Sequence, residues 1–197
     1  MSGNRWQTIA MMKEENCIVL DFLPHGYADR RHAEPVAQAV GTSFFTLLEV
    51  IPREGTDFAQ GESVYIGEGK REKVMFIKGQ IEFKDLTNMA QNYLEDAVKA
   101  IVEGSEDRFV EFFNKSGPVT PRMHRFQLLP GIGSKHMQAV LAERAKKPFA
   151  SLKDIEERVK LFPDPKKTII RRVLEELKQD EKYYLFVAKP QKKEERY

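Results

Sequence analysis

Seven consecutive residues, PGIGSKH at 130–136, have the types and spacing best suited to chemistry. Their two glycines allow turn conformations closed to other residues, and leave no side chain to keep a ligand away. Ser134 is expected to cap a helix whose first amides have no intrahelical partner and carry the positive end of the helix dipole. Lys135 adds a charge, and His136 is expected beside the bound group. This run therefore predicts a backbone cradle for an anion such as phosphate.

The alternative is a hairpin that only joins two core helices, with Ile132 pointing inward to hold the turn. The distribution of charge favours the anion site. Residues 1–104 carry 11 Lys and Arg against 16 Asp and Glu, whereas residues 105–197 carry 21 against 14. Between residues 115 and 172 the counts are 14 and 5. Such a concentration is typical of a polyanion-binding half, although a solvated basic surface would give the same counts.

The elements that position this run divide into two kinds. The first half is rich in aromatic and β-branched residues with period-two alternation, which predicts short strands. Four or five such strands in about seventy residues suit a small antiparallel barrel similar to the OB-fold, so an α+β protein is expected. The predicted strands are 17–23, 42–51, 63–67, 74–77 and 79–86.

From Leu86 onward the hydrophobic period is helical. Helices are predicted from there to Gly104, from Ser105, from Thr120 to about Leu129, from Ser134, from Ser151 and from Asp164. A last strand at 183–188 is expected to return to the barrel, followed by a charged tail. The predicted domains are 1–86 (OB-like barrel), 87–117 (connecting helices and linker), 118–180 (helical domain) and 181–197 (return strand and tail).

The segment LLPGIGSKHMQAVLAER, residues 128–144, resembles the helix-hairpin-helix motif of DNA repair, replication and ribosomal proteins. KPFASLKDIEERV, residues 147–159, resembles the connector of tandem helix-hairpin-helix domains. In the second hairpin of this tandem, the glycines are replaced by Pro163, Asp164 and Pro165, so the second hairpin is expected to be degenerate. The whole chain is similar to an uncharacterised archaeal family that combines a barrel with such a tandem. The resemblance implies that residues 118–180 form an all-α tandem helix-hairpin-helix domain and that this domain binds the nucleic-acid backbone.

Other chemistries find less support. GEGKR at 67–71 fails the phosphate-loop pattern, and the histidines and Cys17 lack metal-ligand spacing. A single cysteine, no apolar run of membrane length and no signal-like N-terminus predict a soluble cytoplasmic protein. Asp154 and Arg158 fall near the positions of a catalytic Asp and its following Arg in base-excision glycosylases, but the connector accounts for them already.

The sequence thus predicts a protein without enzymatic activity or cofactor that binds duplex DNA or structured RNA and no membrane. The alternative is an adaptor that docks on a ribosomal or repair protein. In the barrel, secondary candidates for single-strand binding are three aromatic residues, which would otherwise be barrel core, and five basic loop residues: Phe45, Tyr65, Phe76, Arg30, Arg31, Lys70, Arg71 and Lys73. The predicted nucleic-acid-binding residues are Gly131, Ile132, Gly133, Ser134, Lys135, His136, Lys146, Lys147, Lys166, Lys167, Arg171 and Arg172.

Overall fold

The chain forms two compact units in a computed structural model that describes residues 13–28, 34–178 and 181–189. The first unit comprises Met1–Ala97 and Phe186–Tyr197, and the second comprises Val98–Leu185. The division falls inside helix α1 (Asn88–Gly104) and not between residues 117 and 118, where the sequence predicts the boundary between the linker and the helical domain. The helix expected from Ser105, α2 (Glu106–Lys115), consequently belongs to the second unit and is no mere connector.

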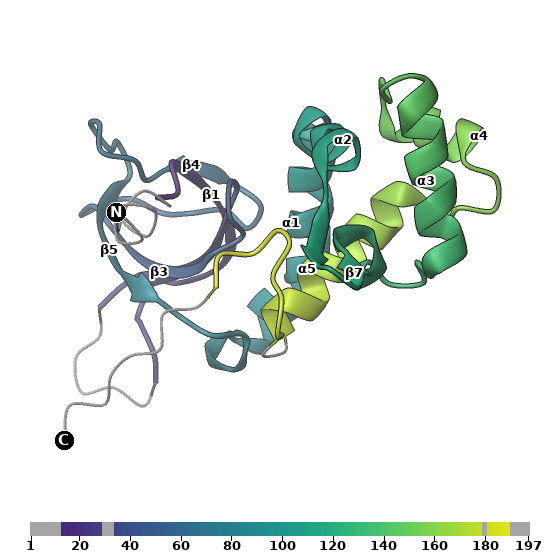
Figure 1. The fold of residues 1–197 in the computed structure, drawn as a ribbon. Helices are drawn as coiled ribbons and strands as arrows, with labels where there is room; N and C mark the ends of the chain where they lie inside the picture. Colours follow the sequence, from purple (N-terminus) through teal and green to yellow (C-terminus); the bar gives the residue numbers. More distant parts are fainter. Residues whose placement is uncertain (1–12, 29–33, 179–180, 190–197) are drawn as a thin grey trace, which may run out of the picture. The chain divides into compact units, whose positions relative to one another are not determined.

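The first unit is built on a curled five-stranded antiparallel sheet (Figure 1). Its strands are ordered β4-β1-β2-β3-β5, and in the described residues no ladder joins β4 to β5, so the sheet is a half-barrel. A short 3₁₀ helix, η2 (Phe83–Asp85), follows the last strand. The strands are β1 (Asn16–Leu23), β2 (Val36–Gly41), β3 (Leu47–Pro52), β4 (Ser63–Tyr65) and β5 (Val74–Gln80).

Small and β-branched side chains form much of the core that the curled sheet encloses. Cys17 and Val19 on β1 pack with Ala39 on β2 and with Val50 on β3. Burial, followed by the nearby Glu14 carboxylate, raises the pKa of the Cys17 thiol to about 12. Since the thiolate is the reactive form, Cys17 is a core residue and no nucleophile.

The strand predicted at 42–51 is a strand only from Leu47 onward, because residues 42–46 form a turn, and strand β2, which the sequence analysis missed, ends just before that turn. Phe45 has a φ of 53° and is fully buried. The Glu14 carboxylate accepts hydrogen bonds from the amides of Ser43 (2.8 Å), Phe44 (2.9 Å) and Thr46 (3.1 Å). A carboxylate that is far away in sequence therefore bends this segment, which its own residue pattern describes as extended.

The second unit is mainly helical. The helix predicted at 120–129 is replaced by a small β-hairpin, β6 (Pro118–Thr120) and β7 (Met123–His124), and a 3₁₀ helix, η3 (Arg125–Leu128). The imidazole Nδ1 of His124 accepts the Phe126 amide and starts η3 only there. The remaining helices agree with the sequence pattern: α3 (Ser134–Lys146), α4 (Leu152–Arg158) and α5 (Pro165–Lys178).

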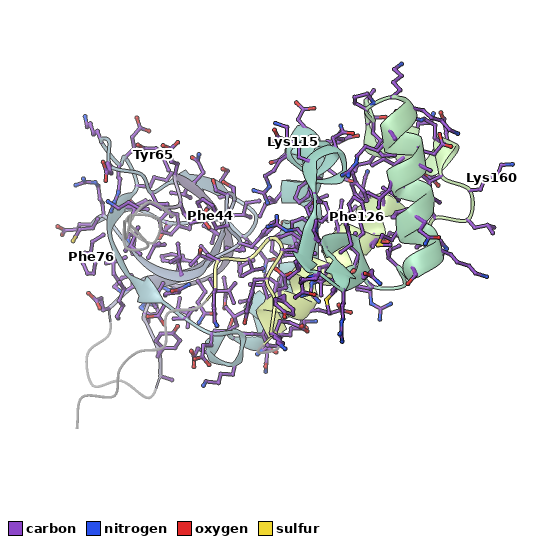
Figure 2. The ribbon with its side chains drawn as sticks, in the orientation of Figure 1. Phe44, Tyr65, Phe76, Lys115, Phe126 and Lys160 are labelled. Atoms are coloured by element: carbon purple, nitrogen blue, oxygen red, sulfur yellow. The ribbon has the colours of Figure 1, made fainter. Side chains whose placement is uncertain are left out.

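Aromatic rings hold the second unit together. Phe113 on α2 stacks on Phe126 of η3 with ring centroids 5.5 Å apart, and meets Phe162, which precedes α5, at 5.8 Å. Figure 2 shows Phe126 among the helices. The Arg144 guanidinium of α3 donates to the carbonyls of Phe113 and Ser116 at the end of α2. The segments before α3 and before α5 therefore share one core.

The segment at 181–189 is irregular, so the strand predicted at 183–188 is absent. Its end does return to the first unit, where the Ala188 amide donates to the Phe44 carbonyl at 3.0 Å. The predicted charged tail, 191–197, lies outside the described residues. Within the described ranges no helix is long and apolar enough to cross a membrane.

Candidate functional site

The first hairpin, residues 129–133, is a β-turn that leads into α3. The Leu129 carbonyl accepts the Ile132 amide at 3.1 Å, and Gly131 between them has a φ of 78°, as the third residue of a type II turn requires. Ile132 is 5% exposed and anchors the turn in the core, as the sequence predicts. Gly131 is therefore the position where glycine is needed for backbone conformation.

Gly133 has a different role from the expected one. It is the N-cap of α3, with a φ of −92° that any residue can adopt, and Ser134 is the first helical residue, not the cap. A Cβ added at Gly133 would meet no atom within 4 Å. The backbone conformation at Gly133 does not require glycine, and the effect of glycine here is to leave space beside the start of α3.

The first amides of α3 face this open space without intramolecular acceptors. The first hydrogen bond of the helix is made by the Met137 amide, which donates to the Gly133 carbonyl at 3.0 Å. In the part of the chain that the structure describes, no hydrogen bond engages the amides of Gly133, Ser134 or Lys135. The exposed Lys135 side chain has no ion pair there either. Donors, dipole and charge at one open point are what an anion requires.

The second hairpin, residues 159–163, repeats the first turn. The Val159 carbonyl accepts the Phe162 amide at 3.2 Å, Leu161 between them has a φ of 61°, and Phe162 is buried like Ile132. This turn places Leu161 at the position of Gly131 and Pro163 at that of Gly133. The residues that stand where the first hairpin has its glycines are therefore Leu161 and Pro163, and not the predicted run Pro163, Asp164 and Pro165.

The start of α5 after the second hairpin is closed to an anion. The Asp164 carboxylate accepts the Lys167 amide at 3.1 Å, whereas Gly133 has no side chain to accept the equivalent amide of α3. Pro163 and Pro165 have no amide hydrogen to offer. One hairpin therefore presents open amides, and its structural repeat presents a carboxylate in their place.

The two hairpins are neighbours. A Cβ on Gly131 would lie 4.0 Å from Pro163 Cγ, and the His136 ring contacts Phe162 edge-on with centroids 6.2 Å apart. The predicted neighbour of the anion, His136, is accordingly half-buried against the second hairpin.

Most of the predicted flanking cations are ion-paired. Lys146 contacts Glu143 at 2.6 Å, Lys166 contacts Glu103 at 3.2 Å, Lys167 contacts Asp164 at 3.7 Å, and Arg171 contacts Glu175 at 3.1 Å. These pairs are exposed and weak, so they can open for a stronger acceptor. Lys147 has no such partner in the described residues, but α3 separates it from the cradle by about 20 Å.

Arg172 has to be removed from the predicted set, because it is 5% exposed. Its Nε donates to Glu176 at 2.7 Å, and its Nη2 donates to the Tyr183 carbonyl at 2.6 Å. Glu176 in turn accepts the Leu185 amide at 2.7 Å. This buried pair fastens residues 183–185 to α5 and leaves no donor for a phosphate.

Lys160 was missed by the sequence reasoning. It is exposed in the second hairpin, one residue before Leu161, and has no ion pair among the described residues. Figure 2 shows its side chain pointing away from the helices. The sequence offers no signal for it, because Lys160 matches Pro130 only once the hydrogen bonds of the two turns are aligned.

Asp154 and Arg158 have structural roles. Arg158 donates to the carbonyls of Glu143 (2.6 Å) and Lys147 (2.7 Å) at the end of α3, and to the Asp154 carboxylate at 3.0 Å. Asp154 also accepts the Ala150 amide at 2.9 Å, while Ser151 caps α4. The connector is thus a clamp between α3 and α4, and Ser151 caps α4 where the sequence predicts a helix to start.

We expect Asp154→Asn to reduce the acid sensitivity of folding. The Ala150 amide, and after it the Arg158 guanidinium, hold the pKa of Asp154 below its ordinary value. Its contribution to stability is therefore present above the unfolded pKa of about 4 and is lost as the pH falls through the folded pKa. Urea midpoints at pH 3, 4 and 6 should change less in Asp154→Asn than in wild type. Glu156→Gln, at an exposed site on the same helix, should keep the wild-type profile; equal flattening in both variants would contradict the clamp.

The barrel offers fewer candidates than expected. Phe45 is fully buried and cannot stack on a base, whereas Tyr65 and Phe76 are 38% and 41% exposed. Arg71 donates to the Gly67 carbonyl and Lys73 pairs with Glu62, which leaves Lys70 as the exposed basic loop residue. The further loop candidates Arg30 and Arg31 lie outside the described residues. No cluster of three or more potential metal ligands occurs in the described ranges.

Comparison with known proteins places the chain in a family. Residues 13–188 match the family described as "Protein of unknown function (DUF655)", and the chain belongs to it. It is 44% identical over 171 residues to "Uncharacterized protein MJ0038" of Methanocaldococcus jannaschii, covering 86% of this chain and 77% of that protein. It is also similar to the crystal structure of Af1531 from Archaeoglobus fulgidus, a member of the same family, with a TM-score of 0.80 and 42% identity over 89% of this chain and 100% of that one. The predicted resemblance to an uncharacterised archaeal family is confirmed to this extent.

Proposed function

We propose that this protein binds duplex nucleic acid through its phosphate backbone, without catalysis, and that the first hairpin holds one phosphate as in a helix-hairpin-helix motif. The observation that carries the proposal is the contrast between two copies of one turn. At the first, the amides of Gly133, Ser134 and Lys135 are open, and at the second, the Asp164 carboxylate occupies the equivalent end of α5. Helix N-termini have such amides by default, and the open end of α3, unlike the capped end of α5, leaves them accessible to a phosphate.

The basic residues around the hairpin extend the site. Lys135 and Lys160 are exposed without ion pairs in the described part of the chain, and Lys147 lies at the far end of α3. Together with the cradle they reach three or four phosphates. Contacts of this kind read the backbone and not the bases, so binding should be nearly independent of sequence, with a dissociation constant on the order of micromolar.

The salt dependence of binding tests this proposal. The full chain should bind a labelled 20-base-pair duplex with a slope of log K against log salt of roughly −3, since each neutralised phosphate contributes about −0.9. Lys135→Ala should weaken binding to every sequence alike and make the slope about one unit shallower. Fluorescence anisotropy across a potassium chloride series measures both quantities.

Lys84→Ala is the matched control, because Lys84 is an exposed lysine of the first unit. It removes the same charge and should leave the slope near the wild-type value. If both variants make the salt slope shallower by the same amount, only net charge matters and the hairpin is not the binding site. If the wild-type chain binds neither DNA nor RNA duplexes, the proposed function is wrong.

A further inference from the structure

Leu161 combines two features that a purely structural turn avoids. Its φ of 61° lies in the left-handed region, which disfavours residues with a bulky side chain. Its side chain is 91% exposed and therefore gains little from burial. The related turn has Gly131 at this position, where no such cost arises. A strained, exposed leucine at the place of a glycine indicates a contact outside the chain.

The surroundings of Leu161 specify the chemistry of that contact. Lys160 precedes it, and Pro163, two residues or at most about 7 Å of chain later, lies against the first hairpin. Leu161 is thus an apolar tip that follows a lysine without an ion pair in the described residues, on a hairpin that lies against the one with the open amides. A polyanion that occupies these groups would bring its own apolar surface, the sugar and base edges, onto this tip.

Other occupants fit less well. Within the described residues of the second unit, Leu161 is the single large apolar side chain that is exposed. One leucine provides too little apolar surface for a membrane or for the buried centre of a protein interface, both of which need several such side chains. A single apolar contact beside phosphate-binding groups is a common arrangement on nucleic acid.

We propose that Leu161 is a groove contact: it packs on the sugar and base edge of a nucleotide near the phosphate held at the first hairpin. The inference rests on the proposed function and adds an apolar contact to the proposed contacts with phosphates. The second hairpin, whose anion site is closed by Asp164, then retains a binding role through its apolar tip. Because no counterion is released by such a contact, it adds affinity without changing the salt slope.

Leu161→Gly tests this inference with two readouts of opposite sign. Glycine relieves the left-handed strain, so the thermal midpoint should rise by about 2–4 °C. Affinity for duplex should fall about three- to tenfold through loss of apolar contact, with the salt slope unchanged. Leu161→Asn, which tolerates the same φ but is polar, should also lose affinity, and Leu161→Met should retain most of it.

Duplex DNA and duplex RNA of equal sequence form the two arms of the anisotropy measurement and show which sugar the tip contacts. If wild type binds and Leu161→Gly binds equally well to both, this inference is overturned while the proposed function stands. A loss of affinity accompanied by a change in slope, or an equal loss in Leu161→Met, also overturns it. A wild-type chain that binds neither duplex overturns both proposals.

Discussion

Gly133→Asp is expected to lower duplex affinity tenfold or more while leaving the protein folded. The substitution reproduces at α3 the arrangement that Asp164 makes at α5, where the carboxylate accepts a first-turn amide. Gly133 has a φ of −92° and empty space around it, so an aspartate fits without strain. As an N-cap, the new carboxylate would accept the amide of Lys135 or His136, and from there it would repel a phosphate held by the neighbouring open amides. Each charged hydrogen bond lost in this way costs about 1.5–3 kcal/mol.

Folding should respond in the opposite direction. Aspartate is a better N-cap than glycine by a few tenths of a kcal/mol, so the urea midpoint of Gly133→Asp should stay level or rise slightly. Gly117→Asp is the matched control, because Gly117 also has open space around it and lies in the same unit. It makes the same change in net charge and should bind almost like wild type. Wild-type affinity in a folded Gly133→Asp would show that the hairpin is only a connector.

Glu176→Ala is expected to destabilise the second unit by about 3–5 kcal/mol, the usual cost of leaving a buried charge without its partner. The Glu176 side chain is fully buried and that of Arg172 is 6% exposed. The variant leaves the buried guanidinium with the Tyr183 carbonyl and the more distant Glu181 carboxylate at 3.5 Å, and it removes the acceptor of the Leu185 amide. Residues 183–185 should therefore detach from α5, and their amides should lose protection in hydrogen exchange.

Arg171 and Glu175 provide the control for this prediction, since they form the same pair with the same spacing on the same helix. The Arg171 side chain is 72% exposed, so Glu175→Ala should cost at most about 0.5 kcal/mol. Arg172→Met combined with Glu176→Leu removes both buried charges and should recover much of the loss. Equal urea midpoints for Glu176→Ala and Glu175→Ala would contradict the assigned role of the buried pair.

Local patterns predicted much of the helical unit. The start of α4 at Ser151 and the start of α5 at Asp164 follow from capping residues, and Gly131 follows from the turn that needs it. These features depend on hydrogen bonds within a few residues, which the sequence displays directly. The division of the chain into a strand-rich part and a helical part was likewise correct, because hydrophobic period distinguishes the two.

Local patterns failed where a distant group decides the backbone. The turn that replaces the first half of the strand predicted at 42–51 depends on Glu14, which lies 29 residues before Ser43 in the sequence. The turn at Leu161 has no glycine, so nothing in its residue types announces a repeat of the first hairpin. Only the matching hydrogen bonds of Ile132 and Phe162 reveal it.

The sequence by itself determined that the basic charge is concentrated in the helical half and that an apolar glycine turn lies within it. Tertiary structure decided which charges are free. Arg171 and Arg172 are adjacent in sequence, yet they point to different sides of α5, and residues 183–185 cover only one of them. Composition counts both arginines equally, but a charge can contact a ligand only if no part of its own chain already holds it, and that depends on packing between residues distant in sequence.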